Sequence, residues 1–204
     1  MATREEPLDP TEVLAAYLEG VNGVDRAAVV VEDWEMASPC GQWRAVDLAG
    51  HLLAIARYYH RLLDAAAAGS PLVDLPRGRQ LAAMNAEDLV RLTDGDGPER
   101  ARRFVAAARE YASRLGRIDW TLTLGTWSGL GDLSIGEHTA VAVGEWHVHA
   151  WDIARSAGLD HRPNDPLTIA RGQAAVGRDI GPGEPWIALL RAYGRDPEWS
   201  QSSE

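Results

Sequence analysis

The chain has 204 residues, 46% of them hydrophobic, and a formal net charge of −10. This composition supports one substantial hydrophobic core, and we expect a single domain over 1–204, with its core at about 9–158 and a C-terminal extension at about 159–204. The acidic balance, with no basic run to offset it, argues against nucleic-acid binding. No stretch approaches the roughly 20 uncharged apolar residues of a membrane span, and no apolar signal-peptide region is present, so the sequence predicts a cytoplasmic protein.

All 20 basic residues are arginine, and this absence of lysine excludes Schiff-base and lysine general-base chemistry. The same bias, together with alanine-rich runs such as residues 65–68, is typical of a GC-rich bacterial genome. Cys40 is the only cysteine, so the chain has no internal disulfide. No histidine or acid neighbours Cys40 in the sequence, and we interpret it as a small buried residue rather than a nucleophile.

Helical periodicity dominates the first third of the chain. The first helix is expected to begin at residue 10, where a proline follows an aspartate N-cap. Gly20 and Gly23 are expected to weaken this helix before it resumes toward Trp34. A second helix is predicted over about 45–68, and a glycine, serine and proline end it.

The rest of the chain continues the helical pattern. Further helices are expected over about 79–92, 99–115, 134–157, 165–176 and 186–193, with an extended loop that holds a short strand over about 118–132. The helix after that loop opens with Ser134 and Glu137 at capping-box spacing. Four long helices, each with one apolar face, pack most simply as an all-α four-helix bundle.

Metal-competent side chains lie on the inward stripe of two of these helices. Glu145 and His149 are one turn apart on one face, and His51 lies among the leucines that mark a core-facing stripe. Two histidines and one carboxylate would leave a fourth position open, as in catalytic zinc sites. A carboxylate among apolar neighbours also needs a strong partner. The pattern therefore predicts a divalent-metal site on these three residues, against the alternatives of a solvent-exposed Glu–His pair and a hydrogen-bonded core histidine.

Two aspartates are candidates for supporting the predicted ligands. Asp47 precedes His51 by one turn and could accept a ring N–H, although a helix-start role for its carboxylate is the favoured interpretation. Asp152 follows His149 by three residues, and its role stays open between the same two alternatives. No catalytic residue beyond the metal ligands is identified.

Other side chains are expected near the predicted metal. His138 shares the helical stripe of Glu145 but lies about 10 Å from it along the helix, too far to bind the same ion. We expect it to line the pocket above the metal with Tyr58, which follows His51 by seven residues, and with Trp127. The remaining histidines are expected to be ordinary surface or hydrogen-bonded residues: His60, His147 and His161.

Two segments carry a family resemblance. Residues 39–52, Pro-Cys-Gly-Gln-Trp-Arg-Ala-Val-Asp-Leu-Ala-Gly-His-Leu, resemble the Pro-Cys…Trp…Asp-Leu-x-x-His-Leu signature of the DinB-like metalloproteins. More narrowly, they are similar to the mycothiol-dependent maleylpyruvate isomerase group, whose second signature, Glu-x-x-x-His-x-Trp-Asp-Leu-Ala, resembles residues 145–154. Residues 125–129 resemble the glycine-containing loop of that group. Residues 193–199, Tyr-Gly-Arg-Asp-Pro-Glu-Trp, resemble the ending of small actinobacterial members described as metal-binding.

The resemblance covers about residues 9–199 and implies a four-helix bundle that holds a divalent ion, commonly zinc. The residues that match the ligands are His51, Glu145 and His149. It also implies a cytoplasmic enzyme in which the metal activates a low-molecular-weight thiol, mycothiol in actinobacteria. Two departures stand out: Arg44 replaces the usual capping Thr or Ser, and the chain after His149 is too short for the C-terminal domain of the isomerase, which argues against maleylpyruvate itself as the substrate.

We therefore expect a metal-dependent thiol transferase or isomerase that acts on a small electrophile with mycothiol as cosubstrate. Two alternatives stay open: a hydrolase or cyclase that uses metal-bound water, and a non-catalytic protein that binds a metal or a small molecule. Three protein ligands rather than four argue against a closed structural site. The sequence predicts no nucleic-acid or membrane partner, and it leaves the metal, the electrophile and the formation of a homodimer open.

Overall fold

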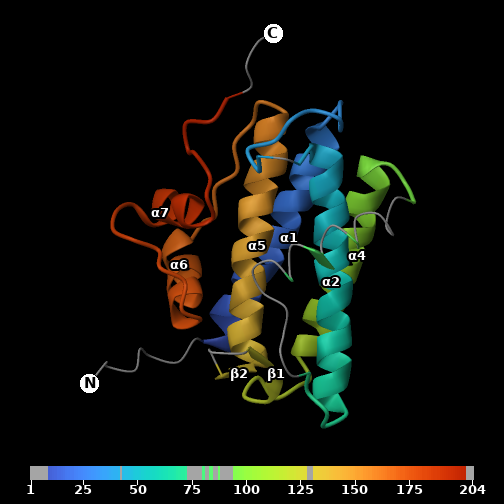
Figure 1. The fold of residues 1–204 in the computed structure, drawn as a ribbon, viewed down its shortest axis with the longest axis vertical. Helices are drawn as coiled ribbons and strands as arrows, with labels where there is room; N and C mark the ends of the chain where they lie inside the picture. The colour runs from blue at the N-terminus through green and yellow to red at the C-terminus, as the bar shows by residue number, and fades with distance from the viewer. Residues whose placement is uncertain are drawn as a thin grey trace.

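Four long helices lie along a common axis in the computed structural model (Figure 1). The structure describes residues 9–41, 43–72, 94–127 and 131–200, together with 80, 83, 84 and 87. The long helices are α1 (Pro10–Val30), α2 (Ala45–Ala67), α4 (Gly97–Leu115) and α5 (Ile135–Ser156). Helix α1 packs against α4 and α5, and α2 packs against the same two helices, so all four enclose one core. The predicted all-α four-helix bundle is confirmed.

Local sequence signals set the starts of all four long helices, including α4, where Asp96 Oδ1 accepts from the Glu99 amide at 2.9 Å. Asp9 caps α1 by accepting a hydrogen bond from a first-turn amide at 2.8 Å. At the start of α5, Ser134 Oγ accepts from the Glu137 amide (3.1 Å), and Glu137 Oε2 accepts from the Ser134 amide (2.7 Å). Helix α2 begins without a Ser or Thr cap, and there Asp47 Oδ2 accepts from both the backbone N–H (3.1 Å) and the Nε–H (2.9 Å) of Arg44. Each such cap contributes roughly 1 kcal/mol.

Helix α1 runs without a break through Gly20 and Gly23, so the two glycines do not interrupt it, and it ends at Val30, before Trp34. The two glycines lie where neighbouring segments approach the helix most closely. A Cβ atom at Gly20 would lie 2.8 Å from Cβ of Trp146, and one at Gly23 would lie 2.6 Å from Cε1 of His161. Glycine therefore serves close packing here, at a cost in helix propensity of about 1 kcal/mol relative to alanine.

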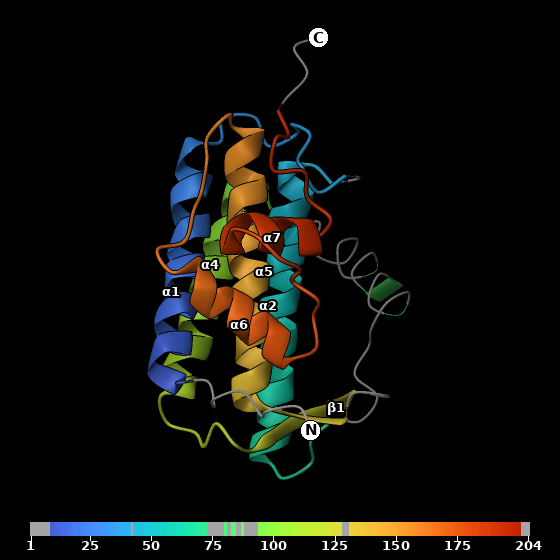
Figure 2. The same cartoon turned by 90° about the vertical axis from the view of Figure 1, so that its left-hand side faces the viewer.

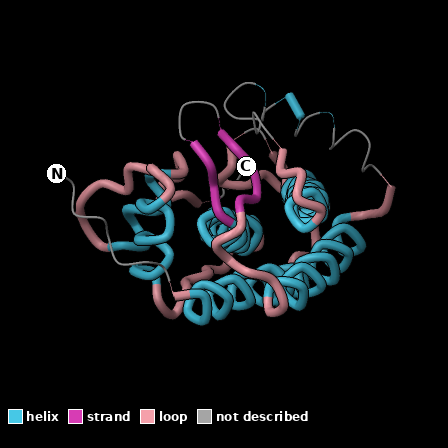
Figure 3. The backbone as a smooth tube through the Cα atoms, turned by 90° about the horizontal axis from the view of Figure 1, so that it is seen from below, coloured by secondary structure: helices cyan, strands magenta, loops and turns pink. Residues whose placement is uncertain are grey.

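The segment expected to be an extended loop with one strand is a two-stranded hairpin. Strand β1 (Thr123–Trp127) pairs antiparallel with β2 (Gly131–Ser134), with a shift in register between Thr123 and Gly125. The hairpin lies across one end of the bundle (Figures 1 and 3), and Leu124 and Leu133 are buried against the helices. The helix predicted over about 79–92 lies almost entirely outside the described residues.

Two short helices follow α5 and match the predicted ones closely. They are α6 (Pro166–Ala175) and α7 (Pro185–Ala192). Figure 2 shows them lying across α5, with the chain after α7 rising beside the upper part of the bundle. The guanidinium of Arg155 donates a hydrogen bond to the carbonyl of Trp199 and ties this last segment to α5. The C-terminal extension thus covers the face of α5 that carries the site described below.

Aromatic side chains fill the centre of the bundle. Trp146 of α5 makes edge-to-face contacts with Phe104 of α4 (centroids 4.8 Å apart) and Tyr17 of α1 (5.9 Å). All three side chains are fully buried, and truncating one of this size to alanine typically costs 3–5 kcal/mol. In the part of the chain that the structure describes, no helix is both long and apolar enough to cross a membrane.

Candidate metal centre

Three polar side chains meet in the otherwise apolar space between α2 and α5. The two helices run in opposite directions (Figure 1), so His51, near the start of α2, lies opposite His149, near the end of α5. One ligand atom each of His51, Glu145 and His149 lies within 4.8 Å of the other two. Nε2 of His149 is 3.4 Å from Oε2 of Glu145, which is about the separation of two ligands bound to one tetrahedral zinc ion at roughly 2.0–2.2 Å.

An indole ring shields the two histidines from solvent. His51 and His149 are 4% and 3% exposed, and their rings meet edge to face with centroids 5.0 Å apart. The ring centroid of Trp43 lies 4.4 Å from that of His51 and 6.3 Å from that of His149. The side chain of Glu145 is 19% exposed, so solvent reaches the cluster from the side of this carboxylate.

A buried carboxylate fixes the orientation of His149 through the ring nitrogen that does not face Glu145. Nδ1 of His149 lies 2.9 Å from Oδ2 of Asp152, which is itself fully buried. The Asp152 carboxylate also accepts hydrogen bonds from Arg195, with distances of 3.0 Å from Nε to Oδ1 and 2.8 Å from Nη2 to Oδ2. An ionised carboxylate can only accept, so Nδ1 of His149 is the donor. In the neutral ring, Nε2 then directs a lone pair at the carboxylate of Glu145, and two acceptors 3.4 Å apart need a cation or a proton between them.

Burial and mutual charge determine the protonation of the three side chains. Burial, with a further contribution from His149, lowers the pKa of His51 to about 3. Burial favours a higher pKa for Glu145, but the hydrogen bond and charge of His149 outweigh it, and this pKa falls to about 2. Burial also favours a lower pKa for His149, but its hydrogen bonds to Asp152 and Glu145 outweigh that effect and raise the pKa. At neutral pH His51 is neutral and Glu145 is ionised, which are the states that a metal ion requires.

One further observation bears on whether a metal fits. Nδ1 of His51 is buried without a hydrogen-bond partner among the described residues, and an unsatisfied buried group costs about 1–3 kcal/mol. The cluster thus combines a neutral imidazole, an ionised carboxylate, and a second imidazole whose Nε2 faces that carboxylate. Such a donor set fits a divalent ion with a preference for nitrogen and oxygen ligands.

A second group of potential ligands shares His149 with the first. Cys40, His149 and Asp152 also bring one ligand atom each within 4.8 Å of one another. A protein cation already lies among them, because Nη2 of Arg195 donates to Sγ of Cys40 at 2.9 Å and to Asp152. Burial raises the pKa of the Cys40 thiol to about 11, against the opposing effect of Arg195. Cys40 is partly buried and packs against the hydrophobic core, whereas a buried residue was expected.

Side chains of the C-terminal extension lie beside Glu145, on the side of the cluster that solvent reaches. Nη2 of Arg178 lies 3.9 Å from Oε1 of Glu145. The guanidinium of Arg178 stacks on the ring of Tyr193 at 3.9 Å, and its Nε donates to Oε1 of Gln173 at 3.2 Å. The hydroxyl of Tyr193 donates to the same oxygen at 3.0 Å. This set of residues was not expected from the sequence, although the resemblance of residues 193–199 to the ending of metal-binding proteins was a signal for part of it.

The two candidate supporting aspartates have different environments. Asp47 is bonded to the backbone and guanidinium of Arg44 at the start of α2, and no bond joins it to His51 in the described structure. Asp152 contacts the imidazole of His149 directly. Asp47 therefore lies at a helix start, whereas Asp152 orients a candidate ligand, although both have a similar spacing from a histidine in the sequence.

The structure describes the side chains of two of the three predicted pocket residues. His138 is buried, with its ring edge to face against Tyr59 at 4.5 Å, and its Nδ1 has no partner within the described chain. Tyr58 is half-buried with Arg61 over its ring at 5.3 Å. Trp127 belongs to β1, but its side chain lies outside the described residues. Their contribution to a pocket above the metal stays a prediction.

The other three histidines are hydrogen-bonded within the protein, and two of them are buried together. Nε2 of His60 lies 2.9 Å from the carbonyl of Ala107. Nε2 of His147 lies 2.9 Å from the carbonyl of Ala16, and its Nδ1 lies 3.1 Å from Nε2 of His161. This buried pair was not expected from the sequence, because its partners come from α5 and from the following loop.

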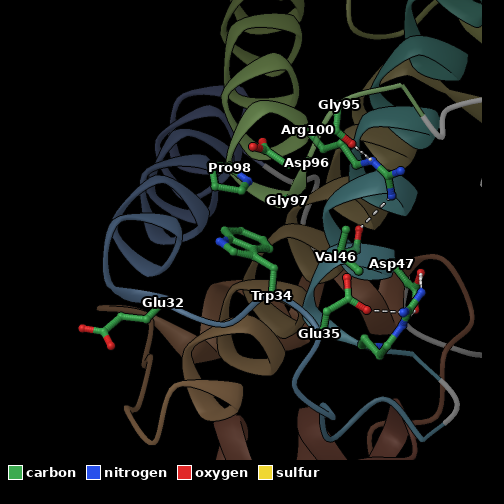
Figure 4. A pocket seen from close by; sticks show the side chains of 11 residues that line it. Glu32, Trp34, Glu35, Val46, Asp47, Gly95, Asp96, Gly97, Pro98 and Arg100 are labelled. Atoms are coloured by element: carbon green, nitrogen blue, oxygen red, sulfur yellow. Dashed lines mark hydrogen bonds and ion pairs between the residues drawn. The ribbon is translucent and has the colours of Figure 1, made fainter.

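A separate concavity of about 550 Å³ lies at the end of the bundle where α2 and α4 begin (Figure 4). Its two arginines are paired with carboxylates or with backbone carbonyls. Arg44 pairs with Glu35 and Asp47, and Arg100 donates to the carbonyls of Gly95 and Val46. With these groups already satisfied, the concavity offers no comparable set of converging ligands, and we place the candidate site at the His51 cluster.

Comparison with known proteins connects this site with a family. The family model described as the mycothiol maleylpyruvate isomerase N-terminal domain matches residues 22–154, well over half of the chain. The matched span includes the three candidate ligands and Asp152, and it ends before Arg178 and Arg195. No curated protein matches the chain, and no solved structure does.

Proposed function

Because the chain belongs to the mycothiol maleylpyruvate isomerase N-terminal domain family, we propose that it is a metal-dependent thiol transferase or isomerase. In this proposal His51, Glu145 and His149 bind one divalent ion, zinc in the first instance, and mycothiol is the cosubstrate. The observation that carries the proposal is the 3.4 Å approach of His149 Nε2 to Oε2 of Glu145, in a ring whose other nitrogen is already bonded to Asp152.

The charges of the proposed ligands favour an anionic fourth ligand. Two neutral imidazoles and one carboxylate leave a net charge of +1 around a divalent ion, and an ion so bound lowers the pKa of a coordinated thiol or water. Trp43 covers the two histidines and excludes water from that side. Glu145 marks the accessible side, where the fourth ligand and the electrophile would enter.

We also propose that the electrophile carries a carboxylate or another anionic group. Arg178 lies beside Glu145 on the accessible side, and its side chain remains 33% exposed. Its stacking on Tyr193 and its hydrogen bond to Gln173 hold the guanidinium in place. A guanidinium that is fixed in place and permanently charged can form two parallel hydrogen bonds with a carboxylate.

Metal analysis of the purified protein tests the ligand set. We expect about one equivalent of zinc in the wild-type protein and a strong loss in Glu145→Gln and His149→Ala. Glu110→Gln is the matched control, because Glu110 is exposed on α4, and it should retain the metal. Equal metal content in all four proteins would contradict the proposed ligands.

A screen of electrophiles with and without mycothiol tests the reaction. We expect turnover that needs both the metal and the thiol, on substrates such as enones, epoxides and activated halides, with carboxylate-bearing members preferred. Metal-dependent hydrolysis or cyclisation without a thiol would favour the water-activating alternative. Tight metal binding with no turnover on any substrate would favour the non-catalytic alternative.

A further inference from the structure

We propose that Arg195 is a positioning residue that directs the metal to one side of His149 and excludes it from the other. The proposal rests on the metal site proposed above and extends it to a residue outside the family's domain. Nε2 of His149 faces Glu145, whereas Nδ1 faces Asp152, and His149 belongs both to the group with His51 and to the group with Cys40. The two groups of potential ligands therefore compete for one imidazole.

The group on the Nδ1 side is chemically capable of binding zinc. A thiolate, an imidazole nitrogen and a carboxylate are all common zinc ligands, and the ligand atoms of Cys40, His149 and Asp152 lie within 4.8 Å of one another. Spacing alone thus does not decide which side of the ring an ion occupies. A further interaction is needed to make the choice.

Arg195 supplies that interaction, because its guanidinium uses the acceptors that a cation would need. Nη2 donates to Oδ2 of Asp152 at 2.8 Å and to Sγ of Cys40 at 2.9 Å, and Nε donates to Oδ1 of Asp152 at 3.0 Å. Nη1 donates to the carbonyl of Tyr193 at 2.6 Å, which anchors the fork to its own segment. The side chain of Arg195 is 11% exposed and that of Asp152 is fully buried. A metal ion could enter this group only by displacing a buried permanent cation that is hydrogen-bonded to both the thiol and the carboxylate.

The same contacts control the tautomer of His149. With the Asp152 carboxylate held as an acceptor by Arg195, the imidazole donates from Nδ1, which leaves Nε2 as the nitrogen available to a metal ion. Without Arg195, Asp152 would be a buried carboxylate in need of a new cation. Cys40 and Nδ1 of His149 lie within reach to complete a ligand set around that cation.

Arg195 reaches this position through the turn that ends α7. The turn passes through Gly194, whose φ of +74° disfavours other residues, and the amide of Arg195 donates to the carbonyl of Leu190 at 2.9 Å. The match to the family model ends at residue 154, and Arg195 lies beyond it.

Cobalt substitution distinguishes the two sides of the ring, because a thiolate ligand produces a charge-transfer band in the near ultraviolet. Arg195→Met should show this band when loaded with Co²⁺, whereas the wild-type protein and the double variant Arg195→Met, Cys40→Ser should lack it. We also expect Arg195→Met to weaken zinc affinity at the original site by roughly 10–100-fold, measured by competition with a chelator. Arg195→Lys, which keeps the charge, should lack the band and retain part of the affinity.

Arg191→Met is the matched control, because Arg191 is exposed on α7, and it should behave like the wild-type protein. If Arg195→Met does not fold, the same measurements are made on Arg195→Gln. Unchanged zinc affinity and no band in the charge-neutral variant would overturn the proposal. Weakened affinity without the band would overturn the exclusion and retain the positioning role. A wild-type protein that binds no zinc would instead contradict the proposed function, whatever the Arg195 variants do.

Discussion

Nδ1 of His149 and Oδ2 of Asp152 lie 2.9 Å apart in the interior of the protein, one turn of α5 from each other. This contact joins a candidate metal ligand to a carboxylate that is fully buried and already paired with Arg195. The orientation of the imidazole therefore depends on a chain of interactions that extends to the last described segment of the protein.

Replacement of Asp152 by asparagine should weaken this chain at its centre. Asparagine has nearly the same shape, but it lacks the charge that holds Arg195 and strengthens the hydrogen bond from His149. We expect zinc affinity to fall about 10–100-fold, measured by competition with a chelator. Asp160→Asn, at an exposed position after α5, should leave the affinity unchanged. If both variants bind zinc like the wild-type protein, Asp152 has no role in positioning the ligand.

Packing of α1 against α5 gives a second prediction. Gly20→Ala should destabilise the protein by about 1–3 kcal/mol, because the new Cβ would lie 2.8 Å from Cβ of Trp146. This loss exceeds the gain of about 1 kcal/mol in helix propensity. Urea unfolding measures the difference.

Gly116→Ala provides the control for that experiment. Gly116 follows α4 with φ of −66°, and its nearest neighbouring atom would be 3.8 Å from a new Cβ. We expect no loss of stability there, and a gain of about 0.4–1 kcal/mol is the usual result at a compatible position. Equal effects of the two substitutions would show that close approach at Gly20 is not the cause.

The helices and the candidate ligands could be predicted because their signals are local. The proline after Asp9 and the capping box at Ser134 mark helix starts within a few residues. Glu145 and His149 share a face because one helical turn separates them. His51 could be added because its apolar neighbours mark a core-facing stripe, and only the packing of α2 against α5 was needed to bring it to the pair.

The environment of the site could not be predicted, because it depends on contacts between distant segments. Arg195 reaches Asp152 across 43 positions, and no periodic pattern connects them. From the sequence, Asp47 and Asp152 could each have supported a histidine or served a helix start. Only the hydrogen bond of Asp47 with Arg44 and that of Asp152 with His149 distinguish their roles. The expectation for Gly20 rested on helix propensity alone, whereas the reason for glycine at this position is the close approach of Trp146 from another helix.

Burial of His138 predicts a pH-dependent stability. Burial lowers the pKa of this imidazole to about 4, against about 6.5 in the unfolded chain. Below pH 6.5 the unfolded state binds a proton that the folded state does not, so stability falls as pH decreases from 6.5 toward 4. At pH 5 this contribution is about 2 kcal/mol relative to pH 7.

Urea unfolding of the wild-type protein and His138→Leu at pH 7 and pH 5 measures this contribution. The difference in unfolding free energy between the two pH values should be smaller in the variant by about 2 kcal/mol. A comparison of the two differences cancels the titration of every other group. If the variant loses as much stability as the wild-type protein on acidification, the imidazole is not held neutral by the fold.

The nature of the electrophile gives the last prediction. Arg178 lies 3.9 Å from Glu145, and its position depends on Tyr193 and Gln173 rather than on that carboxylate alone. Arg178→Gln should therefore lower kcat/KM for carboxylate-bearing electrophiles by about 10–100-fold, the worth of a hydrogen bond to a charged group, and change it little for neutral ones. Arg171→Gln, on the exposed face of α6, should leave both values unchanged. The ratio of the anionic to the neutral rate is the decisive quantity, because an equal loss on both classes would mean that Arg178 supports Glu145 and does not recognise the substrate.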